Sequence, residues 1–492
     1  MAKESSEISP AGIKVSRHSD IPLYIQVYEQ FREMILSKRL RPGDRIPASR
    51  NLAIEMGVSR VIISQAYEQL MMEGYLVGRT GSGTFVADKI PDHLLSAAKN
   101  GGGSGQVNNP PKGDLLQGNP FFGDRMVVEP FQAGSPSLDH FPYKAWQQVG
   151  NAVLKELKGT HLGYEDTLGY LPLRKAIASY LRMSRAVTCE ADQVIVVTGS
   201  QQGLNLVAKG LLQKGDGVWM EDPGYPGAVM SFKEAEVSLC PVPVQEDGLD
   251  ITYAIQKYGH AKLAYVTPSH QFPLGYTLSQ AKRLQLLEWA RDNKMWILED
   301  DYDSEFRYEG RPLESLQGLD THGRVIYSGT FSKVLFPGLR LAYIVAPSPE
   351  IVRIFKRMKS SLDRQSPIID QLMVCRFMEE GYFLRHIRKM RLLYAERQNI
   401  LISLLKEALE DYFRIDTSPS GMHLVCWLSD KIDVERFKQE IRKQQLLVHF
   451  VDYCILEHKL PPAVVLGYTA FTKYKLKIAV EKLVICVHNA LR

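Results

Sequence analysis

The sequence contains few cysteines, and their pattern would not build a structural framework. Six cysteines are scattered over 492 residues, and they form neither CxxC pairs nor the spacing of a zinc site. We therefore expect buried thiols in a reducing compartment, with no disulfides and no metal centre. No apolar run is long enough to cross a bilayer, and the start MAKESSEISPAGIKVSRHSD is too polar for a signal segment. We expect a cytoplasmic protein with no membrane partner.

A strong charge of one sign and the common nucleotide-binding motifs are also absent. The formal net charge is only +5, which argues against a protein that coats nucleic acid over its whole surface but allows one basic module. No GxGxxG opens a βαβ unit, and there is no Walker motif. A chain of 492 residues is too long for one ordinary core, so we expect at least two units.

One stretch is poor in residues that could build a core. The segment AAKNGGGSGQVNNPPKGD, residues 97–114, consists mainly of Gly, Asn, Ser and Pro, and this composition predicts a flexible linker. We predict three parts on this basis. They are a winged helix-turn-helix domain at 20–90, a linker at 91–127 and a large domain at 128–492.

The front part has the pattern of a helix-turn-helix followed by a wing. PLYIQVYEQFREMILSKRL carries apolar residues at helical spacing. The segments SRNLAIEM and SRVIISQAYEQLMMEG then predict two helices joined at Gly57. Two strand-like runs, 75–77 and 84–87, follow around a turn holding Gly78, Gly81 and Gly83, which predicts a hairpin.

Basic residues are concentrated in this front part. Six Lys and Arg residues stand against two acidic residues between Lys38 and Arg60, which is the local charge that phosphate contacts need. Taken singly, these features fit a solvated face on a three-helix bundle, but their combination favours DNA binding. The residues expected at phosphates and in the major groove, with the last one on the wing, are Arg50, Ser59, Arg60, Ser64, Gln65 and Arg79.

The back part alternates strand-like and helical segments. This alternation predicts an α/β fold with a mostly parallel sheet covered on both faces, and chemistry beyond the carboxyl ends of the strands. The strand-like runs are DQVIVVTG, GVWMED, KLAYVTP, KMWILED and RVIYSGT.

The residues that follow these runs are chemically consistent with one another. Ser200 begins a helix, where free N–H groups favour a phosphate, although Ser is also a common N-cap. Tyr225 lies in the turn PGYPG and could stack on a planar ring or simply pack. Asp300 ends a buried strand, where it could cap the structure or hold a protonated ring nitrogen.

A single lysine, Lys333, lies between two apolar runs in VIYSGTFSKVLFPGLRLAYIV. It could be a solvated loop lysine, but a buried ammonium is costly and an imine would remove its charge. Arg340 could bind a phosphate with its rigid fork of donors. An aldehyde-reactive lysine, a carboxylate for a ring nitrogen and a phosphate cup together predict a pyridoxal 5′-phosphate site.

The sequence resembles the MocR/GabR subfamily of GntR-type bacterial regulators. These proteins fuse a winged helix-turn-helix to a fold-type-I aminotransferase-like domain. The resemblance implies such a domain with a smaller C-terminal α+β subdomain. It also implies a homodimer that contacts repeated DNA half-sites with two front modules. The motifs that carry it are RPGDRIPASRNLA, GVSRVIISQAYEQLMMEGYL, GSGTFV, GYLPLRKAIASYL, TGSQQGLNL, PGYPGA, TPSHQFPLG, EDDYDSEFRY and SGTFSKVLFPGLRLAY.

The resemblance also assigns roles to individual residues. Lys333 would form the imine, Asp300 would pair with the pyridine nitrogen, and Tyr302 would hydrogen-bond the phenolic oxygen of the ring. Tyr225 would stack on the ring. The residues that resemble a phosphate cup are Ser200, Gln201, Thr330 and Arg340.

Three further positions follow from the resemblance. Tyr164 matches a tyrosine that in aminotransferases reaches the phosphate of the neighbouring subunit, which implies shared sites. His270 and Gln271 lie where aminotransferases contact the ring oxygen, although the asparagine of those enzymes is missing here.

The sequence departs from the aminotransferase pattern near its end. No arginine occurs between Arg442 and Arg492, where those enzymes carry the arginine that grips a substrate carboxylate. LGYTAFTKYKLKIAV offers Lys473, Lys475 and Lys477 instead. An α-amino acid held by the usual bidentate contact is therefore disfavoured. We expect another amine, a differently held amino acid, or the cofactor itself as effector.

Three functions remain open from the sequence. The leading hypothesis is a transcriptional regulator dependent on pyridoxal 5′-phosphate, in which an amine exchanges with Lys333 and changes DNA affinity by linkage. The second is a working aminotransferase, or one with a residual half-reaction, that the front module localises. The third is a structural back domain that only dimerises the DNA readers.

Overall fold

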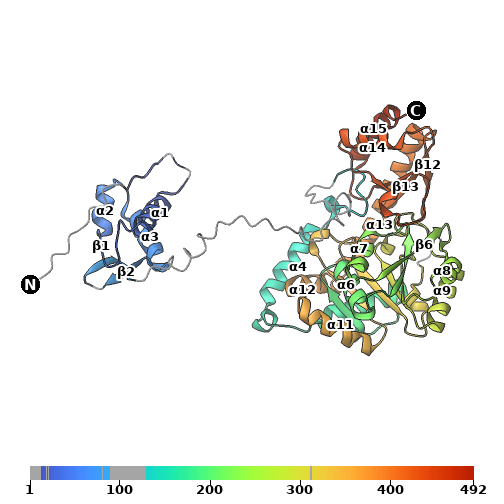
Figure 1. Ribbon diagram of the computed structural model, residues 1–492, viewed down its shortest axis with the longest axis horizontal. Helices are drawn as coiled ribbons and strands as arrows, with labels where there is room; N and C mark the ends of the chain where they lie inside the picture. Colours follow the sequence, from blue (N-terminus) through green and yellow to red (C-terminus); the bar gives the residue numbers. More distant parts are fainter. Residues whose placement is uncertain (1–12, 18, 20, 80, 89–128, 311–312) are drawn as a thin grey trace, which may run out of the picture. The chain divides into compact units, whose positions relative to one another are not determined.

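The computed structural model describes residues 13–17, 19, 21–79, 81–88, 129–310 and 313–492 (Figure 1). The chain divides into two compact units, Met1–Gly113 and Asp114–Arg492. The linker predicted at 91–127 lies outside the described residues. The boundaries expected at 20–90 and 128–492 stay predictions.

The first unit contains the helices and the hairpin expected from the sequence. Its elements are α1 (Leu23–Leu36), β1 (Arg45–Ile46), α2 (Ser49–Glu55), α3 (Arg60–Met72), β2 (Leu76–Arg79) and β3 (Gly83–Val86). Phe31 of α1 and Tyr67 of α3 meet edge to face at 5.4 Å in its core. This core holds the three helices together although each is short.

The wing differs from its predicted form in two details. β1 was not expected, and it pairs with β3 to give a three-stranded sheet in the order β1-β3-β2. Gly78 and Gly83 lie in the paired strands rather than in the turn, opposite Thr84 and Arg79. The two-residue β1 is too short for a periodic signal in the sequence.

The second unit is built on an eight-stranded sheet with the order β4-β11-β10-β9-β8-β5-β6-β7. The five strand-like runs of the sequence form β4, β5, β8, β9 and β10. From β10 to β6 the neighbours are parallel, whereas β11 is antiparallel to both of its neighbours. The strands are β4 (Val194–Val197), β5 (Gly217–Asp222), β6 (Ser238–Gln245), β7 (Gly248–Leu249), β8 (Leu263–Val266), β9 (Trp296–Asp301), β10 (Val325–Thr330) and β11 (Ala342–Val345).

Helices cover both faces of this sheet, as predicted. Alternate residues of β4 enter different cores, because side chains of a strand point to opposite faces. Val194 and Val196 pack with residues of α5 and α12, and Ile195 and Val197 pack with residues of α6 and α11. The helices are α4 (Tyr143–Glu156), α5 (Leu171–Arg185), α6 (Ser200–Leu211), α7 (Pro226–Glu234), α8 (Ile251–Tyr258), α9 (Gln280–Asp292), α10 (Leu316–Leu319), α11 (Pro349–Leu362) and α12 (Ile368–Glu379).

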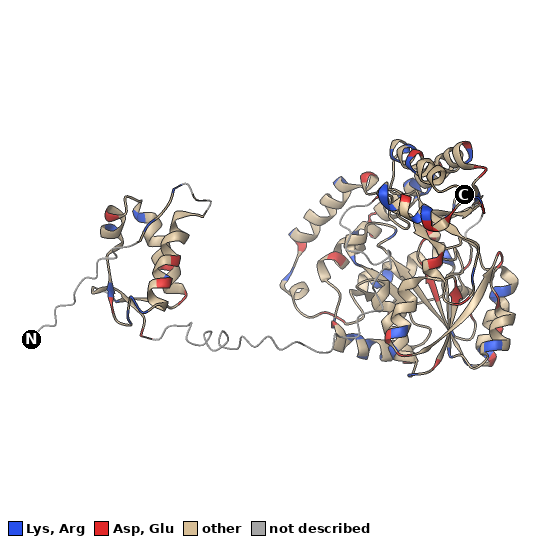
Figure 2. Ribbon diagram, turned by 45° about the horizontal axis from the view of Figure 1, so that its top comes forward, with Lys and Arg blue, Asp and Glu red and all other residues tan. Residues whose placement is uncertain are grey.

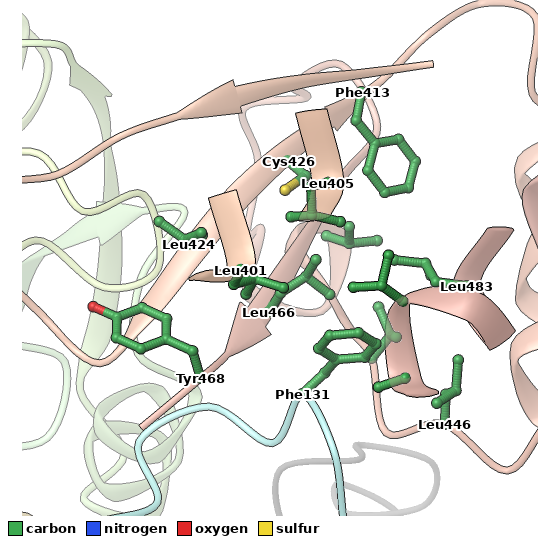
Figure 3. Close-up of a cluster of buried hydrophobic side chains, with 14 of the residues drawn as sticks. Phe131, Leu401, Leu405, Phe413, Leu424, Cys426, Leu446, Leu466, Tyr468 and Leu483 are labelled. Carbon is green, nitrogen blue, oxygen red and sulfur yellow. The ribbon is translucent and has the colours of Figure 1, made fainter. Parts of the chain in front are cut away.

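The C-terminal part forms a separate α+β layer within the second unit. Its antiparallel sheet has the order β12-β13-β15-β14. Phe131, which precedes the large sheet in sequence, enters its core beside Leu401, Leu424 and Leu466 (Figure 3). Its elements are α13 (Tyr382–Leu409), β12 (Phe413–Asp416), β13 (His423–Leu428), α14 (Val434–Lys443), β14 (His449–Phe450), β15 (Ala463–Gly467) and α15 (Lys473–Asn489).

A buried carboxylate joins this layer to the large sheet. Asp222, at the end of β5, accepts hydrogen bonds from the backbone N–H groups of Leu456, Glu457 and His458 at 2.7 to 2.8 Å. His458 Nδ1 lies 2.9 Å from the same carboxylate. These contacts hold a loop of the C-terminal layer at the edge of the sheet where the strands end.

Candidate functional site

A cavity of about 330 Å³ opens at the carboxyl edge of the large sheet. It collects residues from the loops after β4, β5, β9 and β10, because parallel strands end at the same edge. The cavity is lined by eight of the residues singled out in the sequence, namely Ser200, Gln201, Tyr225, Asp300, Tyr302, Thr330, Lys333 and Arg340.

Lys333 points into this cavity from the loop after β10. Its Nζ donates a hydrogen bond to the carbonyl oxygen of Gly134 at 2.9 Å. A Cβ at Gly134 would lie only 2.8 Å from Nζ, and the φ of +67° there also favours glycine. Burial lowers the pKa of Lys333, while the carboxylates of Asp303 and Asp300 act in the opposite direction. A lysine with a lowered pKa is a better nucleophile at neutral pH.

Asp300 lies on the floor of the cavity at the end of β9. The hydroxyl of Tyr265, from β8, donates to Asp300 Oδ2 at 2.7 Å. Burial raises the pKa of Asp300 to about 6, and the hydroxyl of Tyr265 lowers it. A carboxylate with little access to water gains most from a cationic partner such as a protonated ring nitrogen. Tyr265 was not singled out in the sequence, although it falls in the strand-like run KLAYVTP.

Tyr302 is supported from behind by a buried histidine and a buried carboxylate. His270 Nδ1 lies 3.0 Å from the hydroxyl of Tyr302 and 3.0 Å from Asp303 Oδ2. Burial raises the pKa of Tyr302 well above its usual range, so the hydroxyl stays protonated and can donate. His270 is not one of the described residues that line the cavity. It can act on a bound ring through Tyr302.

The side chain of Gln271 is engaged by its own loop and by the segment that follows β5. Its Nε2 donates to the carbonyl oxygens of Pro223 at 2.8 Å and Phe272 at 2.6 Å. Its Oε1 accepts from the backbone N–H of Leu274 at 3.0 Å. Gln271 does not line the cavity within the described part of the chain. Direct contacts of His270 and Gln271 with a ring oxygen stay predictions.

Another part of the lining has the features of an anion site, and we call it the anion-binding corner. Ser200 begins α6, whose first N–H groups lack helical partners and favour negative charge. Gly199 precedes it with φ of +134°, and a Cβ there would lie 3.0 Å from the guanidinium of Arg340. The guanidinium and the helix start therefore face the same small volume. Gln201 holds the ring of Tyr225 through a bond from its Nε2 to the tyrosine hydroxyl at 3.3 Å.

Tyr164 lies apart from the other ten predicted residues of the cofactor site. Its side chain is 79% exposed, and the guanidinium carbon of Arg364 lies 3.8 Å from the centre of its ring. It does not line the cavity of its own chain. Its expected contact with a neighbouring subunit stays a prediction.

The sequence did not predict a second group of lining residues, three of which belong to the C-terminal layer. We call it the distal wall, and its residues are Gln132, Phe272, His423, Leu447 and His449. His423 begins β13 and His449 begins β14, and both are buried in the C-terminal layer. Burial lowers the pKa of His423 to about 3. No local motif marks these residues, because strands distant in sequence bring them to the cavity.

In the first unit, the candidate DNA contacts lie on α2, α3 and the wing. Arg50, Ser59, Arg60, Gln65 and Arg79 are exposed, and Ser64 is half-buried. The guanidinium carbon of Arg79 lies 4.9 Å from the centre of the Phe85 ring, across the hairpin. Figure 2 shows the basic residues of both units in blue. A helix start and a wing that both present arginine suit a nucleic-acid backbone.

Two negative observations apply to the described residues. No group of His, Cys, Asp and Glu side chains there could hold a metal ion. None of the described helices is both long enough and apolar enough to cross a membrane.

Comparisons with known proteins match both units. The family of bacterial regulatory proteins called gntR matches residues 23–86, and the aminotransferase class I and II family matches residues 128–481. The probable rhizopine catabolism regulatory protein MocR of Rhizobium meliloti is 39% identical over 423 residues, which is 86% of this chain and 85% of that protein. The pyridoxine biosynthesis transcriptional regulator PdxR of Corynebacterium glutamicum is 32% identical over 421 residues, 85% of this chain and 86% of that protein.

Solved aminotransferases share the fold of the second unit. A multiple substrate aminotransferase from Thermococcus profundus matches with a TM-score of 0.68 and 27% identity. The match covers 74% of this chain and 92% of that enzyme.

Proposed function

The chain belongs to the MocR-type transcriptional regulators, which join a GntR-family DNA-binding domain to an aminotransferase-like domain, and we propose that its DNA binding responds to an amine that exchanges with Lys333 on bound pyridoxal 5′-phosphate. The observation that carries this proposal is the placement of Lys333. Its amine is buried, has a lowered pKa and shares one cavity with Asp300 and Arg340.

The residues present fit the cofactor. The start of α6 and Arg340 would hold its phosphate, Tyr225 would lie against its ring, and Asp300 would hold a proton on its ring nitrogen. Bound pyridoxal 5′-phosphate supplies an aldehyde carbon that forms an imine with a primary amine. Lys333 would supply that amine at rest; an incoming primary amine would replace it, and the proton lost by the incoming nitrogen would end on the amine of Lys333.

The contact between Lys333 and Gly134 offers a route from the cavity to the rest of the chain. Lys333 Nζ donates to Gly134 with its amine free, and an imine at Nζ would keep at most one N–H for this contact. Gly134 belongs to a segment that also pairs with the C-terminal sheet through Phe131 and Gly467. This segment is the first described part of the second unit and the part of that unit nearest to the front domain in sequence. Release of Lys333 therefore changes the contacts of a segment that leads toward the DNA-binding domain.

The test is a paired titration of the holoprotein. DNA ligands are first selected from randomised duplexes, and DNA affinity and visible absorbance are then followed while primary amines are added. An effective amine should change both signals together, and Lys333→Ala should abolish the absorbance change and the response of DNA affinity. A DNA affinity that is indifferent to the cofactor and to every amine would refute the sensing role.

The second candidate is an aminotransferase. It is favoured by the match to solved aminotransferases over most of their length. If the protein is an aminotransferase, it should turn over an amino donor and a keto acid steadily. Lys333→Ala should abolish this turnover. Turnover limited to one equivalent per site would leave only the regulatory role.

A further inference from the structure

The distal wall differs chemically from the anion-binding corner. Arg340 and the start of α6 would serve an anion in that corner, whereas the distal wall has polar side chains but no Lys or Arg among the described residues. We propose that the distal wall selects a primary amine whose far end carries a hydroxyl group rather than a carboxylate, an amino alcohol in the simplest case. This inference rests on the proposed function and names the class of its effector.

The charges in the cavity argue against a carboxylate. Among the described residues that line it, the only Lys and Arg side chains are Lys333, which is the reacting group, and Arg340, which faces the start of α6. The lysines that the sequence offers in place of the usual arginine, Lys473, Lys475 and Lys477, are exposed on α15 and do not line the cavity. A carboxylate at the distal wall would lose its water and meet no Lys or Arg there, and of the two histidines of the wall His423 is neutral.

A polar atom of the distal wall can accept a hydrogen bond, so a ligand group that donates one would fit there. His423 Nε2 lies 2.8 Å from the carbonyl oxygen of Pro273, which can only accept, so Nε2 carries the proton. The ring is neutral, and its Nδ1 is therefore an acceptor.

A hydroxyl group can donate to such an acceptor, whereas a carboxylate can only accept. An unpaired buried acceptor is costly, so the correct donor is favoured. A second ammonium group would also donate. Its charge, however, would find only Asp300 among the acidic residues of the lining, and Asp300 lies on the floor against Tyr265. An uncharged donor is the group that this wall accommodates without a buried unpaired charge.

The experiment uses the full-length holoprotein and amines matched in length. The pairs are 2-aminoethanol with glycine and 3-aminopropan-1-ol with β-alanine, with propylamine and 1,3-diaminopropane as further probes. The apparent dissociation constant is read from the visible absorbance of the cofactor, and DNA affinity is measured in parallel. Each amino alcohol should bind at least about tenfold more tightly than its carboxylate counterpart, because an unpaired buried charge is costly.

Variants locate the preference on the distal wall. His423→Phe keeps a ring but removes the acceptor, and it should abolish the advantage of 3-aminopropan-1-ol over propylamine, which we expect to be about fivefold in the wild type. The matched control is His386→Phe. His386 is also buried and its Nε2 lies 3.0 Å from a backbone carbonyl oxygen, that of Val334, but it lies outside the cavity lining. It should retain the preference.

The outcomes separate this inference from the proposed function. Carboxylates or the diamine binding as tightly as the amino alcohols would overturn the inference and leave exchange at Lys333 intact. No response to any amine, propylamine included, would overturn both. The comparison of amines on the wild-type protein decides the matter even if His423→Phe fails to fold.

Discussion

At the scale of the residue, the second unit is organised around ionisable groups held away from water. Lys333 has a lowered pKa and Asp300 a raised one, because burial disfavours the charged form of each. Both groups are therefore poised to change charge when a partner arrives. Such opposed pKa changes within one cavity are typical of functional sites, because stability alone gains nothing from them.

The raised pKa of Asp300 leads to a prediction about stability. Its folded pKa of about 6 lies above the ordinary value of 3.8. Protonation therefore favours the folded state, and this contribution is lost as the pH rises through about 6. In the cofactor-free protein, Asp300→Asn should raise the free energy of unfolding at pH 7.5 by about 2 kcal/mol, since a tenfold change in proton affinity corresponds to about 1.4 kcal/mol.

Urea unfolding at several pH values measures this effect. The advantage of Asp300→Asn should shrink as the pH is lowered from 7.5 to 5, because the wild-type carboxyl group takes up a proton. Added pyridoxal 5′-phosphate should stabilise the wild type more than the variant. An advantage that is independent of pH would contradict the raised pKa.

A second prediction concerns the glycine beneath Lys333. Gly134→Ala should place a methyl group within 2.8 Å of Lys333 Nζ, at a φ of +67° that alanine adopts poorly. We expect a loss of about 1–2 kcal/mol of unfolding free energy and a clear loss of borohydride-trapped cofactor on Lys333. The matched control is Gly323→Ala, which has a φ of +64° but no atom closer than 3.8 Å. It should lose stability but keep the trapped cofactor.

At the scale of the element, the sheet and the C-terminal layer contribute different parts of the site. β4, β9 and β10 end at one edge and deliver Ser200, Asp300 and Lys333. β13 and β14 deliver His423 and His449 to the distal wall from the antiparallel sheet. The parallel strands thus carry the groups suited to the cofactor, and the C-terminal layer carries the groups that would contact an effector.

The attachment of the C-terminal layer can be tested at Asp222. Its carboxylate accepts three backbone hydrogen bonds and lies 2.9 Å from His458 Nδ1. Asp222→Ala leaves these buried donors without their acceptor and should cost about 2–4 kcal/mol in unfolding free energy. Asp433→Ala, which removes an N-cap bond of α14, should cost about 1 kcal/mol. Equal losses in the two variants, measured by urea unfolding, would show that Asp222 is only a local cap.

At the scale of the whole molecule, the chain combines a GntR-family DNA-binding domain with an aminotransferase-like domain. Figure 2 shows both basic and acidic residues on the helices of the second unit. The candidate DNA contacts instead belong to the first unit, where Arg50, Arg60 and Arg79 are exposed. A homodimer, which we propose from the family and from the exposed side chain of Tyr164, would bring two such units to repeated half-sites.

DNA binding by the whole protein should therefore depend strongly on salt and on the first unit. Arg60→Ala and Arg79→Ala should each weaken binding and reduce the slope of log affinity against log salt by about 1, because each removes a phosphate contact. Lys406→Ala removes an exposed cation of the second unit and should leave the slope unchanged. Electrophoretic mobility or anisotropy titrations over a range of salt concentrations measure these slopes. A change of slope in Lys406→Ala alone would move the DNA contacts to the second unit.

The sequence by itself determined what depends on local order along the chain. Periodicity and glycine signals predicted the three helices and the hairpin of the first unit, although not β1, and the five β-rich runs predicted the strands that end beside Ser200, Asp300 and Lys333. The carboxyl ends of parallel strands lie at the same edge of a sheet. The parallel arrangement alone therefore predicted that Ser200, Asp300 and Lys333 lie near one another.

Only the tertiary structure decided which side chains share the cavity with Ser200, Asp300 and Lys333. Tyr265, His423 and Gln132 reach the site through contacts between segments far apart in sequence. The support of Tyr302 by His270 and Asp303 likewise depends on how a loop folds back. Such contacts are set by packing between elements, and the local pattern of a sequence does not encode which distant surfaces will meet.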